Sequence, residues 1–562
     1  MPANPPSSQD DGAERPLLAT ARGASPADYG SSAVSDAQAG VDVTSPPSFS
    51  RNLGALEAFA IVISIVIGSG VFTSPGAIDT NVPSPGLALV IWVVGGVLAW
   101  TGASTLAELG TAIPGEGGVQ PYLQYIFGEA FGFLAAWTWV VAVMPATLAI
   151  LSIVFVESIY SAAGVTDRAG DLSHKLLSVL TLVIISVANC VGTRTTTRLN
   201  GFFVAAKFTA IAAVVAAGVA VVAVHLARGG GHDDQGRREV GGRDWFSRPW
   251  FAYRTTKAPD GSETDWTQLG GWAILGHLSA ALYGALWAYS GWDKAIYISA
   301  ELSAPARQLP LAINTALPVI ILCFLAANTA YYILLPWDVV STTDSVAVTA
   351  ITRLLGPAFG ILAAVLICLV VAGSLLGNSF VAGRMAVAAA HKKWLPVAFS
   401  RVGHIGPRKE EQPPSPSTTP PADPALGAAA PESSVGGTDA APINAILLAA
   451  ALSALYILFG SFRALLTFNG LGEYSFFFLA VLGALVLRVR EPDLQRPYRP
   501  PVVVPTVFAL VSGFVVVRGA LFAPLQAVVL VFVWGLGLLF YFTRKRLAAG
   551  PTLVSSGDGD RT

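Results

Sequence analysis

The segment IGSGVF, at residues 67–72, lies inside an apolar run that extends from about residue 54 to residue 80. Two glycines at this spacing weaken a helix and free backbone amides from helical hydrogen bonds. A second interruption, LWAYSGWD at residues 286–293, breaks the apolar run that lies five runs further along the chain. Paired breaks of this kind indicate an inverted repeat with a binding site between them. Close packing of two membrane helices through small residues is the alternative explanation for the first pair of glycines.

The composition indicates that most of the chain lies in a membrane. Of the 562 residues, 53% are apolar and 12% are charged, whereas soluble domains have about a quarter charged residues. A helix needs about 20 mostly apolar residues to cross a bilayer. The sequence therefore predicts an all-α membrane protein with about twelve transmembrane helices, at 54–80, 86–112, 130–160, 175–192, 199–225, 272–298, 311–335, 348–373, 443–459, 464–488, 502–519 and 525–543. The less apolar run 374–396 is predicted to end the eighth helix and continue as an interfacial segment.

Breaks in the first and sixth of these helices predict a LeuT-like 5+5 inverted repeat in which helices 1 and 6 are discontinuous. Lysine and arginine are retained in the cytoplasmic loops of membrane proteins. Alternate short loops hold most of these residues, which predicts that both termini are cytoplasmic; the basic residues are Arg194, Arg198, Arg307, Lys392, Lys393, Arg488, Arg490, Arg496, Arg499, Arg544, Lys545 and Arg546.

Composition also divides the chain into segments. Residues 1–50 are rich in Pro, Ser, Ala, Gly and Asp and predict a disordered cytoplasmic tail. Residues 51–545 form the membrane domain, and residues 546–562 are predicted to be a cytoplasmic C-terminal tail. Two polar insertions interrupt the membrane domain: an extracellular loop at 226–271 and a Pro-rich cytoplasmic loop at 403–441.

Several function classes are excluded by what the sequence lacks. A formal net charge of -1 argues against nucleic acid as a partner. Cys190, Cys323 and Cys368 lie in apolar segments, where cysteine acts as a small hydrophobic residue. The six histidines have no metal-ligand spacing, and no nucleophile lies beside a base. We therefore expect neither an enzyme nor a metal site nor a cofactor, and no repeated pore loop indicates a channel.

Five motifs in order resemble the L-type transporter branch of the amino acid, polyamine and organocation superfamily, including fungal amino-acid and methionine permeases. They are IGSGVFTSPGAI at 67–78, AELGTAIPGEGGVQPYL at 107–123, WAYSGWDKAIYISAELSAPARQLPLAI at 287–313, GSLLGNSFVAGR at 373–384 and RVREPDLQRPYRP at 488–500. The resemblance covers about residues 51–545 without the two insertions. It implies a sodium-independent permease or exchanger that carries neutral, large L-amino acids by alternating access.

The resemblance also implies which residues bind the substrate. Backbone amides in the first break would bind the carboxylate, and carbonyls in the second break would bind the amino group, in keeping with the partial charges at broken helix ends. The implied substrate-binding residues are Ile67, Gly68, Ser69, Gly70, Val71, Trp287, Ala288, Ser290 and Asn378. Trp287 occupies the family's aromatic gate, and its alternative role is a packed core aromatic. Asn378 matches a position near the side-chain pocket, and its alternative role is a polar contact between helices.

Three of the ionisable residues that lie inside predicted spans, Lys207, Asp293 and Glu473, are candidates for functional roles. Lys207 is flanked by long apolar runs, and an ammonium at that depth costs a few kcal/mol unless it is paired. In the family, a lysine at this place resembles a built-in replacement for a sodium ion; snorkelling to the interface is the alternative. Asp293 stands where the family commonly has Asn, which leaves the charge preference open. Glu473 stands where the family has a neutral residue, so it is either a titrating group in proton coupling or a satisfied structural acid.

Glu108, Glu301 and Arg384 lie near cytoplasmic ends of spans and fit an ion-pair cluster of the family that could close an inner gate. Interfacial anchoring is the equal alternative for these three residues.

The resemblance also concerns partners and location. Mammalian L-type members bind a single-pass glycoprotein through a cysteine in the outer loop between spans three and four, and residues 161–174 contain none. We therefore expect no disulfide-linked heavy-chain glycoprotein, and we expect a plasma-membrane location. The alternatives to a sodium-independent carrier are a proton-coupled symporter of an amino acid such as methionine, a polyamine carrier, and an amino-acid sensor that does not transport.

Overall fold

The computed structural model describes residues 54–113, 118–165, 171–191, 193–227, 241–293, 304–400 and 442–548. All of these residues belong to one compact unit, Ser50–Thr562. Glu301 and residues 1–50, 403–441 and 549–562, on which several sequence predictions fall, lie outside the described residues.

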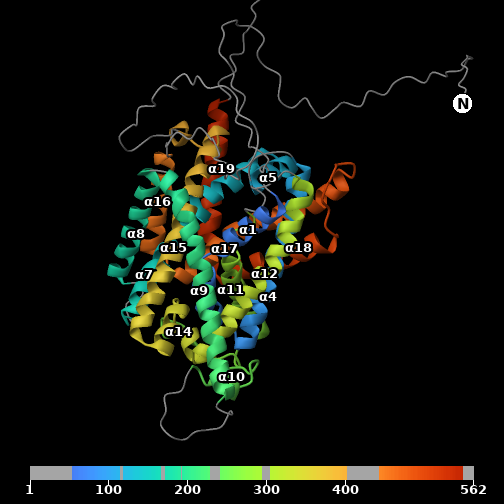
Figure 1. The fold of residues 1–562 in the computed structure, drawn as a ribbon. Helices are drawn as coiled ribbons and strands as arrows, with labels where there is room; N and C mark the ends of the chain where they lie inside the picture. Colours follow the sequence, from blue (N-terminus) through green and yellow to red (C-terminus); the bar gives the residue numbers. More distant parts are fainter. Residues whose placement is uncertain are drawn as a thin grey trace, which may run out of the picture. The chain divides into compact units, whose positions relative to one another are not determined.

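The described chain is almost entirely helical (Figure 1). Its first half contains α1 (Ala55–Val66), α2 (Gly70–Thr73), α3 (Pro75–Asp79), α4 (Pro85–Ala112), α5 (Val119–Phe127), α6 (Glu129–Thr138), a π-helical turn (Trp139–Val143), α7 (Met144–Ala162), α8 (Leu172–Val191), α9 (Thr193–Ala227) and α10 (Asp244–Ser247). A short antiparallel pair, β1 (Thr256–Lys257) and β2 (Glu263–Thr264), follows. The second half contains α11 (Gly271–Ala288), α12 (Pro305–Leu334), α13 (Trp337–Val340), α14 (Val346–Leu355), α15 (Pro357–His391), a 3-10 turn (Val397–Ser400), α16 (Ile443–Phe459), α17 (Phe462–Arg490), α18 (Val503–Phe522) and α19 (Pro524–Ala548).

The predicted all-α membrane architecture is confirmed. Among the described residues, nine helices are long and apolar enough to cross a membrane, and shorter apolar helices occupy three further places. Each of the twelve predicted spans overlaps at least one helix of the described residues. The span Glu129–Ala162 is 89% buried in the bundle and Pro524–Leu547 only 17%. A helix that is apolar all round and mostly exposed needs lipid around it, so α19 lies at the edge of the bundle. Helix α7, which is mostly buried, lies at its centre.

Residues 374–396 were predicted to end the eighth helix and continue as an interfacial segment, and α15 continues without a break from Pro357 to His391, so most of this run is helical. The start of the eighth span differs from the predicted residue 348. Gly356, with a φ of 97°, ends α14, and Pro357 starts a new helix. Helix α15 packs against α7, and a Cβ on Gly383 in the later segment would lie 3.1 Å from Ile446 of α16. Small residues allow such a close approach between membrane helices.

The bundle has two distinct ends, which α17 connects. Near its start, Arg463 donates hydrogen bonds to Asp344 and to the carbonyl of Ser341. Near its end, Arg488 pairs with Glu108 of α4. Figure 1 shows α10 at the lower end of the bundle and α5 at the upper end.

Candidate functional site

A cavity of about 640 Å³ lies in the bundle beside the interrupted first span. Its walls come from the α1–α2 break, the end of α11, α7, α9 and α15. It is lined by most of the residues that the sequence singled out, namely Gly68, Ser69, Gly70, Lys207, Trp287, Ala288, Ser290, Asp293, Asn378, Arg384 and Glu473. Ile67 and Val71 are fully buried beside this set and do not line the cavity. Residues far apart in the sequence therefore meet at one place.

The cavity lies where the two interrupted spans cross. A Cβ atom on Gly70 would come within 2.4 Å of the Ala288 Cα, so the two backbones are in direct contact there. Gly291 has a φ of 108°, in the left-handed region that favours glycine, and packs against Ile65. Both crossings depend on the absence of a side chain. The glycines of the two motifs thus position the breaks against each other.

The first break exposes backbone amides next to the cavity. Helix α1 ends at Val66, and α2 begins at Gly70 with Ser69 as its N-cap. Among the described residues, no backbone carbonyl accepts from the amides of Gly68 or Ser69. Both residues line the cavity. Amides without a helical partner at such a break attract a carboxylate.

The second break supplies carbonyl groups opposite these amides. Helix α11 ends at Ala288, and the Ser290 amide donates to the Trp287 carbonyl at 3.0 Å. The last carbonyls of a helix lack intrahelical partners, so those near the end of α11 can accept from a further donor. The half-buried Trp287 side chain also lines the cavity. An ammonium group therefore finds acceptors on the wall that faces the first break.

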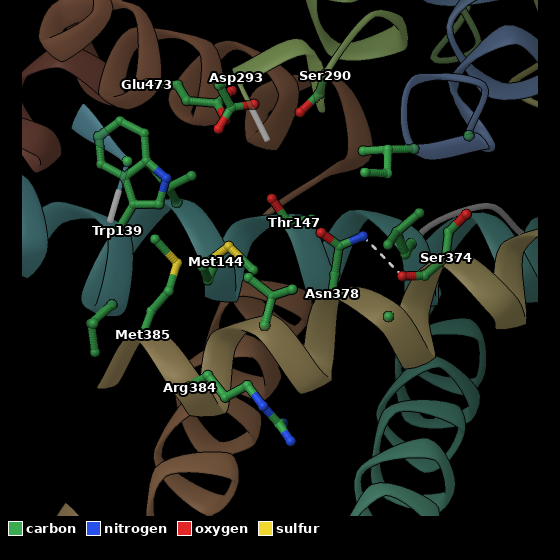
Figure 2. A pocket seen from close by; sticks show the side chains of 18 of the residues that line it. Trp139, Met144, Thr147, Ser290, Asp293, Ser374, Asn378, Arg384, Met385 and Glu473 are labelled. Atoms are coloured by element: carbon green, nitrogen blue, oxygen red, sulfur yellow. Dashed lines mark hydrogen bonds between the residues drawn. The ribbon is translucent and has the colours of Figure 1, made fainter. Parts of the chain in front are cut away.

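Three ionisable side chains in the cavity wall are more than nine-tenths buried. Lys207 is 9% exposed, and Asp293 and Glu473 are each 8% exposed. Figure 2 shows Asp293 and Glu473 on the same wall, with Trp139 nearby. Lys207 reaches the cavity from α9, Glu473 from α17 and Asp293 from the turn after α11. Buried charges at this depth are costly and mark functional pathways in membrane proteins.

Of the three residues predicted to form the inner-gate cluster, Glu301 lies outside the described residues, and Glu108 and Arg384 do not pair with each other. Glu108 pairs with Arg488, whose Nε lies 2.9 Å from a carboxylate oxygen, and with Arg496 at 3.3 Å. Arg384 instead lies over the Phe380 ring, 3.1 Å from its centroid, and is exposed toward the cavity. Glu108 and Arg384 lie on different helices, α4 and α15. The carboxylate of Glu108 is occupied by Arg488, in the last turn of α17, and by Arg496, which follows α17. Sequence position alone could not decide between these arginines.

Asn378 lines the cavity inside the bundle, and Lys392 lines it at the surface. The Asn378 side-chain amide donates to the Ser374 carbonyl at 2.8 Å, within its own helix (Figure 2). Lys392, just beyond α15, is exposed and also lines the cavity. Partial burial lowers the pKa of Lys392 from its ordinary value. The cavity therefore runs along α15 from the breaks to the surface at Lys392, the end that holds Glu108 and Arg488.

The sequence reasoning missed an apolar wall of the cavity. Trp139, Met144, Thr147 and Met385 line it (Figure 2). Trp139 begins the π-helical turn between α6 and α7, and such turns often occur at functional sites. Periodicity cannot detect one extra residue in a helical turn. Pro145, which follows Met144 at the start of α7, is the one local signal of an irregularity in this run.

Interrupted first and sixth spans that cross beside a central cavity define the class of secondary transporters. The family model for amino acid permeases matches residues 53–541. The chain belongs to the amino acid permease family. It is 28% identical over 496 residues to human b(0,+)-type amino acid transporter 1, covering 88% of each chain. It is 26% identical over 493 residues to human large neutral amino acids transporter small subunit 2, covering 88% of this chain and 79% of the relative.

Proposed function

We propose that this permease carries neutral L-amino acids with large side chains by alternating access and without sodium. The observation that carries this proposal is the crossing of the two breaks, which puts the amides of Gly68 and Ser69 opposite the end of α11. A zwitterion supplies the carboxylate and the ammonium that these two backbone segments accept. The apolar wall of Trp139, Met144 and Met385 favours a large uncharged side chain.

Lys207 supports the sodium-independent part of the proposal. Its ammonium is nine-tenths buried in the cavity wall beside the first break. A fixed positive charge at this place can do what a bound cation would do, which is to bind the carbonyls of an unwound span. The names of both relatives describe amino acid transporters, which also fits the proposed substrate class.

The direct test is uptake of radiolabelled leucine and methionine into liposomes that contain the purified protein. We expect saturable uptake that is equal with sodium or choline outside. Uptake that requires sodium would contradict the proposal. Competition by a polyamine, but not by neutral amino acids, would favour a polyamine carrier, and specific binding without uptake would favour a sensor.

A proton-coupled cycle is the second candidate, and the burial of Glu473 supports it. Glu473 is 8% exposed in a cavity wall inside a membrane span, and buried acids in such places mark proton relays in transporters. We expect Glu473→Gln to abolish stimulation of uptake by an inward proton gradient while exchange of internal for external leucine continues. The matched control is Glu129→Gln, an exposed acid outside the cavity that accepts from Tyr541. Equal stimulation in wild type and Glu473→Gln would exclude Glu473 as the coupling group.

We further propose that the chain works at the plasma membrane with both termini in the cytoplasm. The concentration of Lys and Arg at the end where the cavity reaches Lys392 supports this orientation. The three cysteines at 190, 323 and 368 lie far from residues 161–174 in the sequence. We therefore propose that transport does not require a disulfide-linked partner.

A further inference from the structure

The first polar insertion contains an ordered segment, residues 241–266, which we call the strap. It includes α10, the β1–β2 hairpin and the loop between them. The amide of Gly242 donates to the Ile333 carbonyl, and Asp244 accepts from the Trp337 amide at 2.8 Å. Trp250 packs edge-on against Trp337, with ring centroids 5.7 Å apart. The strap is therefore attached firmly to the end of α12 and to α13.

The strap also holds the outer half of the interrupted first span. The Arg254 guanidinium donates to both carboxylate oxygens of Asp79, at 2.5 and 2.6 Å, and to the Trp337 carbonyl at 2.6 Å. Tyr332 donates to the same carboxylate at 2.5 Å. Asp79 ends α3, and its side chain is fully buried. Burial has the largest single effect and lowers the pKa of Arg254, but Asp79, Tyr332 and Asp338 together raise it overall.

A second set of contacts reaches the next residue of the same span. Thr256 of the strap donates to the Thr80 carbonyl at 3.3 Å and accepts from Trp266 at 3.0 Å. Arg463 of α17 donates to the Thr80 hydroxyl and to Asp344. The backbone of α3 also lies directly against the loop after α13, because a Cβ on Gly76 would fall 1.9 Å from the Thr343 carbonyl oxygen. The end of the first span is thus fixed from three sides.

These contacts lie at the end of the bundle opposite the opening of the cavity. Arg463, near the start of α17, belongs to the end that carries the strap, whereas Arg488, near its end, belongs to the end that carries Lys392 and Glu108. The structure is therefore open at one end and closed by the strap at the other. A smaller cavity of about 390 Å³, lined by Ala77, Ala280 and Arg463, lies at the closed end.

We propose that the strap is a gate element, in which Arg254 locks the outer half of the first span through Asp79 and must release it before the site opens at the strap end. The inference rests on the proposed alternating access. In that cycle α2 and α3 move away from α12 and α13, and this movement separates Asp79 from Arg254 and Tyr332. Hydrogen bonds between two charged groups that are nearly excluded from solvent are short and stronger than bonds between neutral groups. Such a pair biases the equilibrium toward the state that contains it.

The test is the double variant Asp79→Asn/Arg254→Gln, which removes both charges and leaves neither one buried alone. The native cysteines are first replaced, and single reporters are then introduced at the two ends: Ala388→Cys in the opening of the large cavity and Ala280→Cys in the small cavity. Labelling rates with a charged maleimide are measured in lipid nanodiscs, where both ends are accessible. The matched control is Lys257→Gln/Glu263→Gln, which removes an exposed ion pair from the same hairpin.

We expect the double variant to slow labelling at Ala388→Cys and to accelerate labelling at Ala280→Cys by at least about fivefold, the lower bound of a typical coupling between two states. The control should leave both rates unchanged. Unchanged rates in the double variant would overturn the proposal whatever the melting temperature, because the pair would then be structural only. Faster labelling at both reporters would also overturn it, since it would indicate a loosened fold. Labelling does not depend on uptake, so a protein that shows the shift but takes up no amino acid would contradict the proposed transport and not the gate.

Discussion

Replacing Lys207 with methionine should slow amino-acid uptake strongly while leaving the protein folded in detergent. The methionine side chain is similar in length and apolar, so it fits a wall that is already nine-tenths buried. Placing an ammonium at the bilayer centre costs about 2.5–3.5 kcal/mol. The contacts of Lys207 that offset this cost are therefore strong enough to change the equilibrium between two states of the transporter by more than about tenfold. We therefore expect the initial rate of leucine uptake into liposomes to fall by at least about tenfold.

Two further variants make this prediction specific. Lys207→Arg retains the charge but presents a planar fork in place of a compact ammonium, and should restore only part of the rate. Lys175→Met removes an ammonium that donates to the Leu458 carbonyl away from the cavity, and should transport at the wild-type rate. Normal uptake by Lys207→Met would refute the role proposed for Lys207.

Gly70→Ala should destabilise the protein and stop transport together. Its new Cβ would lie 2.4 Å from the Ala288 Cα and 3.2 Å from the Ala288 nitrogen, and a backbone cannot rotate out of the way as a side chain can. Overpacking a close contact costs about 1–3 kcal/mol. The two breaks would be forced apart at the place where the carboxylate and the ammonium are bound. We expect a lower melting temperature in detergent and no detectable leucine uptake.

Gly68→Ala is the matched control for this change. A Cβ at Gly68 would have the Val66 carbonyl oxygen, at 3.9 Å, as its nearest neighbour, which is ordinary van der Waals contact. We expect this variant to keep the wild-type melting temperature, because the two glycines differ in their neighbours and not in their motif. Equal loss of stability in both variants would show that helix propensity, and not the crossing with Ala288, decides the effect.

Much of the membrane architecture could be predicted because hydropathy reports directly on lipid. A chain that crosses a bilayer must satisfy its backbone within helices, so each long apolar run becomes a helix. The glycines at 68 and 70 and the WAYSGWD segment likewise predicted two breaks, since the residues that weaken a helix are local in sequence. Lys207 stood out for the same reason, because a single charge in an apolar run is visible without a structure.

Other features depended on contacts between distant segments. The sequence allowed Glu108 to pair with any of several arginines. Only the packing of the helices placed Arg488 and Arg496 beside it. The apolar wall around Trp139 depends on a π-helical turn, which shifts the register of a helix without changing its composition. The extension of α15 through residues 374–391 depends on its packing against neighbouring helices such as α16, which Gly383 contacts.

The sequence alone determined the class of fold, the positions of the two breaks and the buried lysine, because each is a local property of residue type in a low-dielectric solvent. The tertiary structure decided which breaks cross, which charges pair and that the first insertion reaches back to Asp79. Such pairings join residues as distant in sequence as Asp79 and Arg254. They follow from the summed packing of all the helices and not from any one segment.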